Sequence, residues 1–164
     1  MFLKTKLSEK IALEGPLSIS KFMDICLWDC DEGYYSKKQI IGKKGDFITS
    51  PELSQTFGEL IGIWSLSYHL NKFKGKKITL LELGPGKGTL VGDALRAIRK
   101  IRKNKIEIEA YLLEKSSVLQ SIQKKKLMGY NVKWINNIEK MPARPLIIIA
   151  NEFFDALPIN QYVK

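Results

Sequence analysis

Residues 78–88 read ITLLELGPGKG, a short apolar run that leads directly into a glycine-rich turn. The run from Ile78 to Leu83 has almost no polar interruption, which indicates a short strand. Thr89 follows the turn and begins a segment with apolar residues at helical spacing as far as Ile101. This stretch therefore predicts a strand, a tight turn and a helix.

The segments downstream repeat this alternation. A second strand is predicted in residues 108–113, a third in 132–135 and a fourth in 146–150. A helix that Ser116 caps lies between the second and third strands and closes near Gly129. Strands that alternate with helices predict βαβ units with a parallel sheet, and therefore an α/β fold.

The segments upstream of the sheet are predicted to be largely helical. Apolar residues at helical spacing predict two helices within residues 3–27. A long helix is predicted to begin at Ser50, and residues 71–77 form a basic loop. We therefore expect an N-terminal helical or lid region in residues 1–75 and a Rossmann-like region in residues 76–164.

The composition restricts the class of protein. The chain has 164 residues, of which 45% are hydrophobic and 27% charged, and this excludes a disordered or collagen-like chain. The net charge of +10 would suit nucleic acid or an acidic partner. Only four of the 27 basic residues are arginine, however, and nucleic-acid surfaces favour arginine, so we expect no nucleic-acid partner. No apolar run approaches the roughly 18 residues of a membrane span.

Metal ligands are few, and the N-terminus carries no targeting signal that we recognise. Cys26, Cys30 and the single histidine, His69, are too few for a four-ligand zinc site, so no metal is expected. We interpret the cysteines as buried thiols in a reducing compartment. Glu9 and Glu14 argue against a transit peptide, which avoids acidic residues, and we expect a cytoplasmic protein.

The spacing of the glycine turn separates three kinds of site. A phosphate-binding P-loop requires GxxxxGK followed by Ser or Thr, but Lys87 is followed by another glycine. A dinucleotide-binding turn requires GxGxxG, but the third position after Gly84 and Gly86 is Thr89. What remains is glycine at alternate positions, with Glu82 two residues before the first. A tight turn that binds no ligand is the alternative.

Polar residues also follow the second and third predicted strands. Glu114 lies where an acid can accept hydrogen bonds from both ribose hydroxyls of an adenosine, or it is a solvated acid paired with Lys115. Asn136 and Asn137 lie where a side-chain amide can bind the adenine edge, or they form an ordinary turn.

Residues 151–158 read NEFFDALP and come directly after the fourth predicted strand. Ligands bind at the carboxyl ends of parallel strands. Glu152 and Asp155, with the amide of Asn151, lie there beside two phenylalanines, and polar groups in such a place are costly unless they are used. We interpret them as catalytic residues; the alternative is that the acids cap a following helix.

The glycine pattern resembles motif I of the S-adenosylmethionine-dependent methyltransferases with a Rossmann-like fold. Nearly the whole chain is similar to the N-terminal part of the MidA-like family of these enzymes. The mitochondrial members of that family assist the assembly of respiratory complex I by methylating a protein arginine. The stretches that carry the resemblance are residues 33–35 (GYY), 45–52 (GDFITSPE), 57–64 (FGELIGIW), 82–90 (ELGPGKGTL) and 151–158 (NEFFDALP).

The resemblance implies S-adenosylmethionine as the cofactor and a protein as the methyl acceptor. It also implies a class I methyltransferase sheet in the strand order 3-2-1-4-5-7-6, with an N-terminal helical lid. Together with the residue patterns, it predicts cofactor contacts from the glycine turn, two strand ends and the lid: Glu82, Gly84, Pro85, Gly86, Gly88, Glu114, Asn136, Asn137, Asp46, Thr49, Ser50, Pro51 and Glu52. Glu152, Asp155 and Asn151 would then serve the acceptor.

Members of this family are more than twice as long as this sequence, so strands five to seven are expected to be missing. The fourth strand would then be an exposed apolar edge, and a complementing C-terminal chain is a possible partner. Two functions remain open. One is an S-adenosylmethionine-dependent methyltransferase that acts on a protein arginine, and the other is a non-catalytic half-domain, from a split or decayed gene, that needs a second chain.

Overall fold

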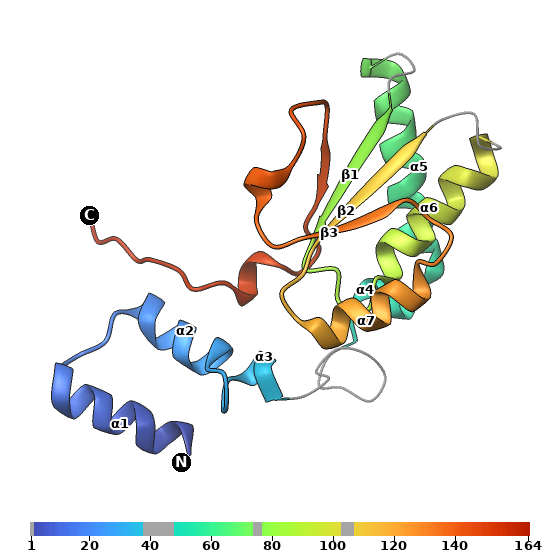
Figure 1. Cartoon of the computed structure of the whole chain (residues 1–164). Helices are drawn as coiled ribbons and strands as arrows, with labels where there is room; N and C mark the ends of the chain where they lie inside the picture. Colours follow the sequence, from blue (N-terminus) through green and yellow to red (C-terminus); the bar gives the residue numbers. More distant parts are fainter. Residues whose placement is uncertain (1, 38–47, 74–76, 103–106) are drawn as a thin grey trace. The chain divides into compact units, whose positions relative to one another are not determined.

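A computed structural model describes residues 2–37, 48–73, 77–102 and 107–164 (Figure 1). The chain forms two compact units. One consists of residues 48–151, and the other combines residues 1–47 with residues 152–164. This division does not coincide with the boundary expected at residue 75, because the helix that precedes the first strand packs against the helix that follows it.

A four-stranded parallel sheet forms the centre of the unit at residues 48–151. Its strands are β1 (Ile78–Leu83), β2 (Ile108–Leu113), β3 (Val132–Ile135) and β4 (Ile147–Ile149), in the order β3-β2-β1-β4. β1 pairs with both β2 and β4, so the strand that leads into the glycine turn is central. The predicted α/β fold and the order of these four strands are confirmed.

Among the described residues of this unit, the α-helices beside the sheet are α4 (Ser50–Leu53), α5 (Gln55–Phe73), α6 (Thr89–Arg102) and α7 (Ser117–Lys126). Figure 1 shows α5, α6 and α7 on the same side of the sheet. Apolar residues from β1, β2, β4, α5 and α6, and one just after α7, form a shared core: Leu66, Ile78, Leu80, Val91, Leu95, Ile98, Ala110, Leu112, Leu127 and Ile147. This packing fixes the positions from which the strand ends present their polar groups.

Three local predictions differ from the structure. The long helix expected from Ser50 is interrupted at Ser54, which has an extended backbone, so α4 and α5 are separate helices. Residues 71–73 of the basic loop expected at 71–77 belong instead to α5, which continues to Phe73, and residues 74–76 lie outside the described residues. β4 is shorter than the strand predicted at residues 146–150.

The second unit contains α1 (Leu3–Glu14), α2 (Ile19–Trp28), α3 (Tyr34–Lys37) and the short 3-10 helix η2 (Phe154–Ala156). The side chain of Ser18 caps α2 by accepting a hydrogen bond from the N–H of Lys21. The indole N–H of Trp28 donates to the carbonyl of Ala156 at 3.1 Å, which ties the end of α2 to the C-terminal segment.

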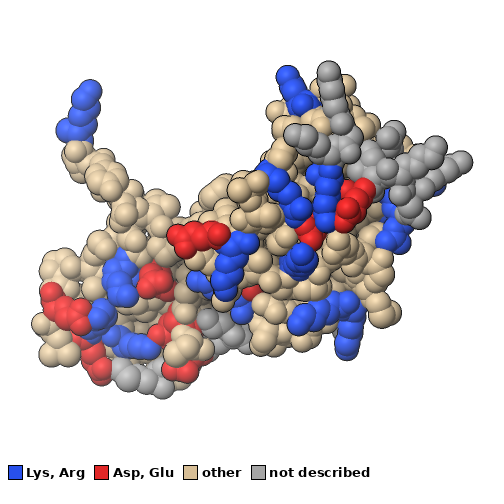
Figure 2. All heavy atoms as spheres, turned by 45° about the horizontal axis from the view of Figure 1, so that its top comes forward, with Lys and Arg blue, Asp and Glu red and all other residues tan. Residues whose placement is uncertain are grey.

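The face of the molecule drawn in Figure 2 shows no single basic patch. In Figure 2 the Lys and Arg side chains are spread over the visible face, with acidic side chains among them. Within the described ranges, no helix is both long enough and apolar enough to cross a membrane.

Candidate functional site

The glycine turn lies at the carboxyl end of the central strand, between β1 and α6. Gly84, Gly86 and Gly88 have φ angles of 61°, 53° and 74°, which place all three in the left-handed region that favours glycine. The N–H of Gly84 donates to the carbonyl of Leu113, and the N–H of Gly88 donates to the carbonyl of Pro85. The turn is therefore tied to the end of β2 and lies at the edge where parallel sheets bind ligands. Gly84 is exposed there, whereas Gly86 and Gly88 are buried.

Glu82 lies beneath this turn, with only 4% of its surface exposed. Burial raises the pKa of its carboxyl to about 8, although the backbone N–H of Val91 in α6 donates a hydrogen bond to it. Its Oε2 atom is buried without a hydrogen-bond partner. A buried carboxyl oxygen without a partner is unusual, and it leaves an acceptor available for a donor that is not part of the chain.

Glu114 lies at the end of β2, the strand beside β1. Its Oε1 atom accepts a hydrogen bond from the N–H of Ser116 at 2.8 Å, and its Oε2 atom accepts one from Gln123 at 3.3 Å. Partial burial raises the pKa of this carboxyl, while the backbone N–H groups of Ser116 and Lys115 and the amide of Gln123 lower it. Lys115 thus acts on Glu114 through its backbone N–H.

The described part of the expected lid meets the first turn of α6. Glu52 of α4 accepts a hydrogen bond from the hydroxyl of Thr89 and lies 3.7 Å from the ammonium of Lys87. Lys126 of α7 donates to the same hydroxyl, so Thr89 joins α4 to α7. Pro51 is buried in α4.

Thr49 and Ser50, two more of the expected lid residues, lie at the start of α4. Thr49 precedes α4 as its N-cap residue, without a side-chain cap bond, and Ser50 is the first residue of the helix. Asp46 lies outside the described residues.

The two asparagines after β3 form mainly local hydrogen bonds. Asn137 caps the 3-10 helix η1 (Ile138–Lys140), accepting from the N–H of Glu139 and donating to its carboxylate. Asn136 accepts from the ammonium of Lys140. These bonds are the turn chemistry that the sequence left open, and both residues are exposed.

The three predicted catalytic residues are divided between the two units. Asn151 is half-buried and belongs to the unit of the sheet, whereas Glu152 and Asp155 belong to the other unit. Glu152 has a φ of 49°, a left-handed conformation that costs free energy for a residue with a side chain. Phe153 is the N-cap of η2 and makes no side-chain cap bond, and Asp155 lies in the first turn of this 3-10 helix.

A family described as "Putative S-adenosyl-L-methionine-dependent methyltransferase" matches residues 60–164, which is more than half of the chain. The chain belongs to this methyltransferase family. The matched residues include the glycine turn, Glu114 and residues 151–158, which are three of the regions singled out in the sequence.

Two vertebrate relatives of this methyltransferase family member share the name "Protein arginine methyltransferase NDUFAF7, mitochondrial". The protein of Xenopus tropicalis is 37% identical over 179 residues, which cover 94% of this chain and 42% of the relative. The human protein is 37% identical over 180 residues, which cover 94% and 41%. The chain therefore spans about two fifths of the length of these relatives.

A solved structure agrees with the methyltransferase fold. It is a crystal structure of a methyl transferase candidate from Burkholderia thailandensis bound to S-adenosyl-homocysteine. The two chains superpose with a TM-score of 0.77 at 26% identity, over 95% of this chain and 42% of that chain.

Sequence reasoning missed Gln123, which lies beside the glycine turn and Glu114. It is completely buried and donates hydrogen bonds to both Glu114 and the carbonyl of Gly86. One sequence pattern could have identified it: Gln123 is a polar residue on the apolar face of α7, four positions from both Leu119 and Leu127.

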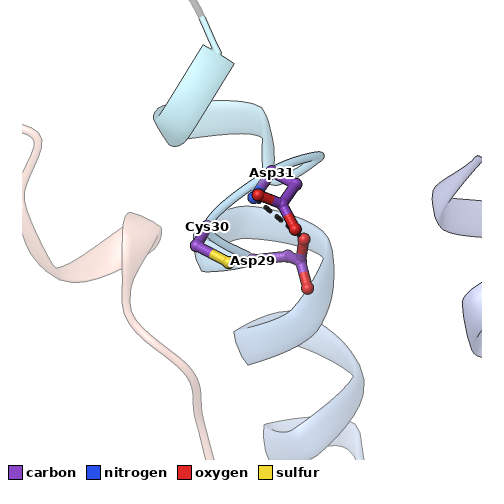
Figure 3. Close-up of side chains that lie close together, drawn as sticks. All are labelled: Asp29, Cys30 and Asp31. Carbon is purple, nitrogen blue, oxygen red and sulfur yellow. Dashed lines mark hydrogen bonds between the residues drawn. The ribbon is translucent and has the colours of Figure 1, made fainter. Parts of the chain in front are cut away.

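A separate group of possible metal ligands lies at the end of α2. Asp29, Cys30 and Asp31 place three ligand atoms within 4.8 Å of one another. Figure 3 shows the hydrogen bond from the N–H of Asp31 to the carboxylate of Asp29, which also accepts from the N–H of Glu32 and pairs with Lys6. These contacts account for the turn without an ion. The prediction of buried thiols is wrong: Cys30 is exposed, because α2 ends at Trp28, and Cys26 within α2 is only half-buried.

Proposed function

We propose that this chain forms the cofactor-binding part of an S-adenosylmethionine-dependent methyltransferase whose acceptor is an arginine side chain of a protein. The observation that carries the proposal is the position of the glycine turn and Glu114 at the ends of two neighbouring parallel strands. Family membership and the names of the relatives support the reaction class and the acceptor.

The residues at this edge fit the cofactor, which supplies an electrophilic methyl group on a sulfonium when it is bound. The glycines of the turn, which place no side chain between its backbone and a ligand, and the N-terminus of α6 suit the carboxylate of its amino-acid end. The partnerless Oε2 atom of Glu82 suits the ammonium of that end. The two oxygens of Glu114, each already oriented by one donor, can accept hydrogen bonds from the two ribose hydroxyls.

The acceptor side of the proposal concerns Glu152, Asp155 and Asn151. A guanidinium is always protonated at neutral pH, so its nitrogens are poor nucleophiles. Two carboxylates would bind the guanidinium, localise its charge and leave one nitrogen directed toward the methyl group. Asn151 would fix its orientation. We place this chemistry on a protein subunit such as one of a respiratory complex, in the cytoplasm or, for eukaryotic relatives, in mitochondria.

Calorimetric titration of the purified chain tests the cofactor proposal. We expect saturable binding of S-adenosylmethionine and S-adenosylhomocysteine and none of NAD or ATP. The Gly86→Val variant should lose that binding, because a branched side chain would occupy a left-handed position next to the ligand. Saturable binding of NAD or ATP, without binding of S-adenosylmethionine, would overturn the proposal.

The acceptor proposal is tested in the full-length protein or in this chain complemented by the rest of the family fold. Glu152→Gln and Asp155→Asn should severely lower methyl transfer to an arginine-containing protein while cofactor affinity stays nearly unchanged. If cofactor binding collapses and turnover at saturating cofactor is normal, the two acids belong to the cofactor site instead.

A second candidate function is that of a half-domain that works only with a partner chain. The observation that favours it is β4, which pairs on one side with β1 and has Ile148 51% exposed. A complementing chain that carries the remaining strands should then convert self-associating material into a monodisperse complex, measured by light scattering. An isolated chain that is monomeric and active would exclude this function.

A further inference from the structure

Gln123 is a buried polar residue to which none of the assignments above gives a role. It lies on α7, and its side chain is completely excluded from solvent. A buried amide must have its donors and acceptor matched, because each unmatched group costs free energy. Its partners therefore show what its position requires.

The amide of Gln123 contacts three parts of the site region. Its Nε2 donates to the carbonyl of Gly86 at 2.8 Å and to Oε2 of Glu114 at 3.3 Å. Its Oε1 accepts from the indole N–H of Trp134 on β3 at 2.7 Å. One side chain thus connects the glycine turn, the end of β2 and β3.

The chemistry of the partners fixes the orientation of this amide. The indole N–H of Trp134 can only donate, so Oε1 must face it. The carbonyl of Gly86 and an ionised Glu114 can only accept, so Nε2 must face them. A carboxylate at position 123 would satisfy Trp134 but would repel Glu114, and an apolar side chain would satisfy none of the three.

Packing holds Gln123 directly against the turn. A Cβ built on Gly88 would lie 3.3 Å from Cγ of Gln123 and 3.4 Å from Cδ1 of Leu127. Gln120, one turn earlier on α7, donates to the backbone carbonyl of Glu114 at 2.8 Å. The helix thus contacts the turn and Glu114 at the same time, and Gln123 is the residue that bonds to both.

We propose that Gln123 is a positioning residue that sets the distance and orientation between the glycine turn and the carboxylate of Glu114. The inference rests on the proposed function, in which these two groups bind opposite ends of one ligand. Gln123 donates from α7 to one lone pair of the Glu114 carboxylate. This hydrogen bond orients the carboxylate so that its remaining lone pairs face the ribose hydroxyls. Trp134 supports it by holding the amide in one orientation.

The test is titration of the purified chain with S-adenosylhomocysteine, for the wild type and four single variants. Gln123→Met removes both ends of the amide and keeps a side chain of similar length. Lys125→Met is the matched control, since it introduces the same residue at an exposed position of α7. Glu114→Gln and Trp134→Phe each remove one partner of the amide.

We expect Gln123→Met to weaken binding about tenfold, which is the effect of one lost hydrogen bond to a charged group, and Lys125→Met to leave it unchanged. Combining Gln123→Met with Glu114→Gln should cost little more than Glu114→Gln alone, because Gln123 acts through Glu114. Trp134→Phe should cause a smaller loss of about two- to threefold.

The indole N–H resonance of Trp134, assigned with the Trp134→Phe variant, is a readout that does not need a folded Gln123→Met protein. In the wild type it should shift when S-adenosylhomocysteine binds, because the amide of Gln123 transmits the change at Glu114. A wild type that binds ligand without that shift would overturn the inference, and so would fully additive losses in the double variant. A wild type that does not bind S-adenosylhomocysteine would instead refute the proposed function.

Discussion

Gly62 of α5 lies directly against the backbone of Ala94 of α6. A Cβ built on Gly62 would lie 2.6 Å from both the Cα atom and the carbonyl oxygen of Ala94, a distance that no real Cβ contact reaches. Gly58, one turn earlier, is also too close to α6 for a side chain, since its Cβ would lie 2.7 Å from the Cβ of Asp93 and 2.9 Å from the carbonyl oxygen of Leu90. The two helices therefore touch through backbone, and α6 is the helix that begins at the glycine turn.

The Gly62→Ala variant should be less stable than the wild type by about 1–3 kcal/mol, because the helices must separate to admit the methyl group. At an exposed helix position the same change would stabilise the helix by about 1 kcal/mol, so the sign of the effect is diagnostic. Urea unfolding measures it. Ser67→Ala, at an exposed position of α5, is the control and should change little. Equal midpoints for Gly62→Ala and the wild type would contradict the close packing.

Glu82 should make stability depend on pH. Its pKa is about 8 in the folded chain and near 4.5 when it is exposed, so the folded chain retains a proton that the unfolded chain has lost. The free energy of unfolding should therefore fall as pH rises from about 4.5 to about 8, and then level off. Glu82→Gln should remove this decline. Parallel stability curves for the two proteins, from urea unfolding between pH 5 and 8.5, would contradict the prediction.

Glu109 should change stability with pH in the direction opposite to that of Glu82. The hydrogen bond from Lys133 is the largest of the effects that lower its pKa to about 2, and Tyr111, Arg144 and Lys77 act in the same direction. Its contribution to stability is present above pH 4.5 and is lost as pH falls toward 2. At pH 7 the Glu109→Gln variant should lose about 1.5–3 kcal/mol in urea unfolding, because three cations lose their shared partner.

Glu107→Gln is the matched control for that measurement. Glu107 pairs with Lys77 at 2.5 Å, but 66% of its side chain is exposed. An exposed ion pair of this kind contributes less than about 1 kcal/mol. If Glu107→Gln lowered the free energy of unfolding as much as Glu109→Gln does, burial would not be the reason why Glu109 stabilises the fold.

Thr89→Val should loosen α4 from the first turn of α6. The variant keeps the shape of the side chain but removes the hydroxyl that donates to Glu52 and accepts from Lys126. The amides of Glu52, Leu53 and Ser54, which donate to the carbonyls at the start of α4 (residues 49 and 50), should exchange with solvent about five- to tenfold faster. Hydrogen exchange followed by NMR measures this, with Thr56→Val at an exposed position as the control. Unchanged exchange would mean that α4 does not depend on this contact.

Most of the sheet could be predicted from the sequence because its signals are local. The apolar run at 78–83, the glycines after it and the alternation with helices specify a parallel sheet, and the structure confirms its first four strands. The break at Ser54 could not be predicted, because neither Ser54 nor either of its neighbours is a proline or glycine, and only the structure shows the extended backbone there.

The candidate site was predictable only as far as strand ends identify it. Glu82 and Glu114 follow from their positions relative to the apolar runs. The role of Gln123 depends on three partners that are 9, 11 and 37 residues away, and no local pattern specifies such a set. The exposure of Cys30 was missed for a simpler reason, which is that burial was inferred from the scarcity of cysteine and not from a position in a helix, and Cys30 lies beyond the end of α2.

The pairing of β1 with β4 has a consequence for how the chain is made on the ribosome. About 60 residues separate these two strands, so at roughly 5–20 residues per second β4 emerges some 3–12 s after β1. During that interval one edge of β1 has no strand beside it, although Leu80 and Leu81 are buried in the finished fold. A chaperone that shields nascent apolar segments for several seconds should therefore raise the yield of folded protein more than one that acts after release.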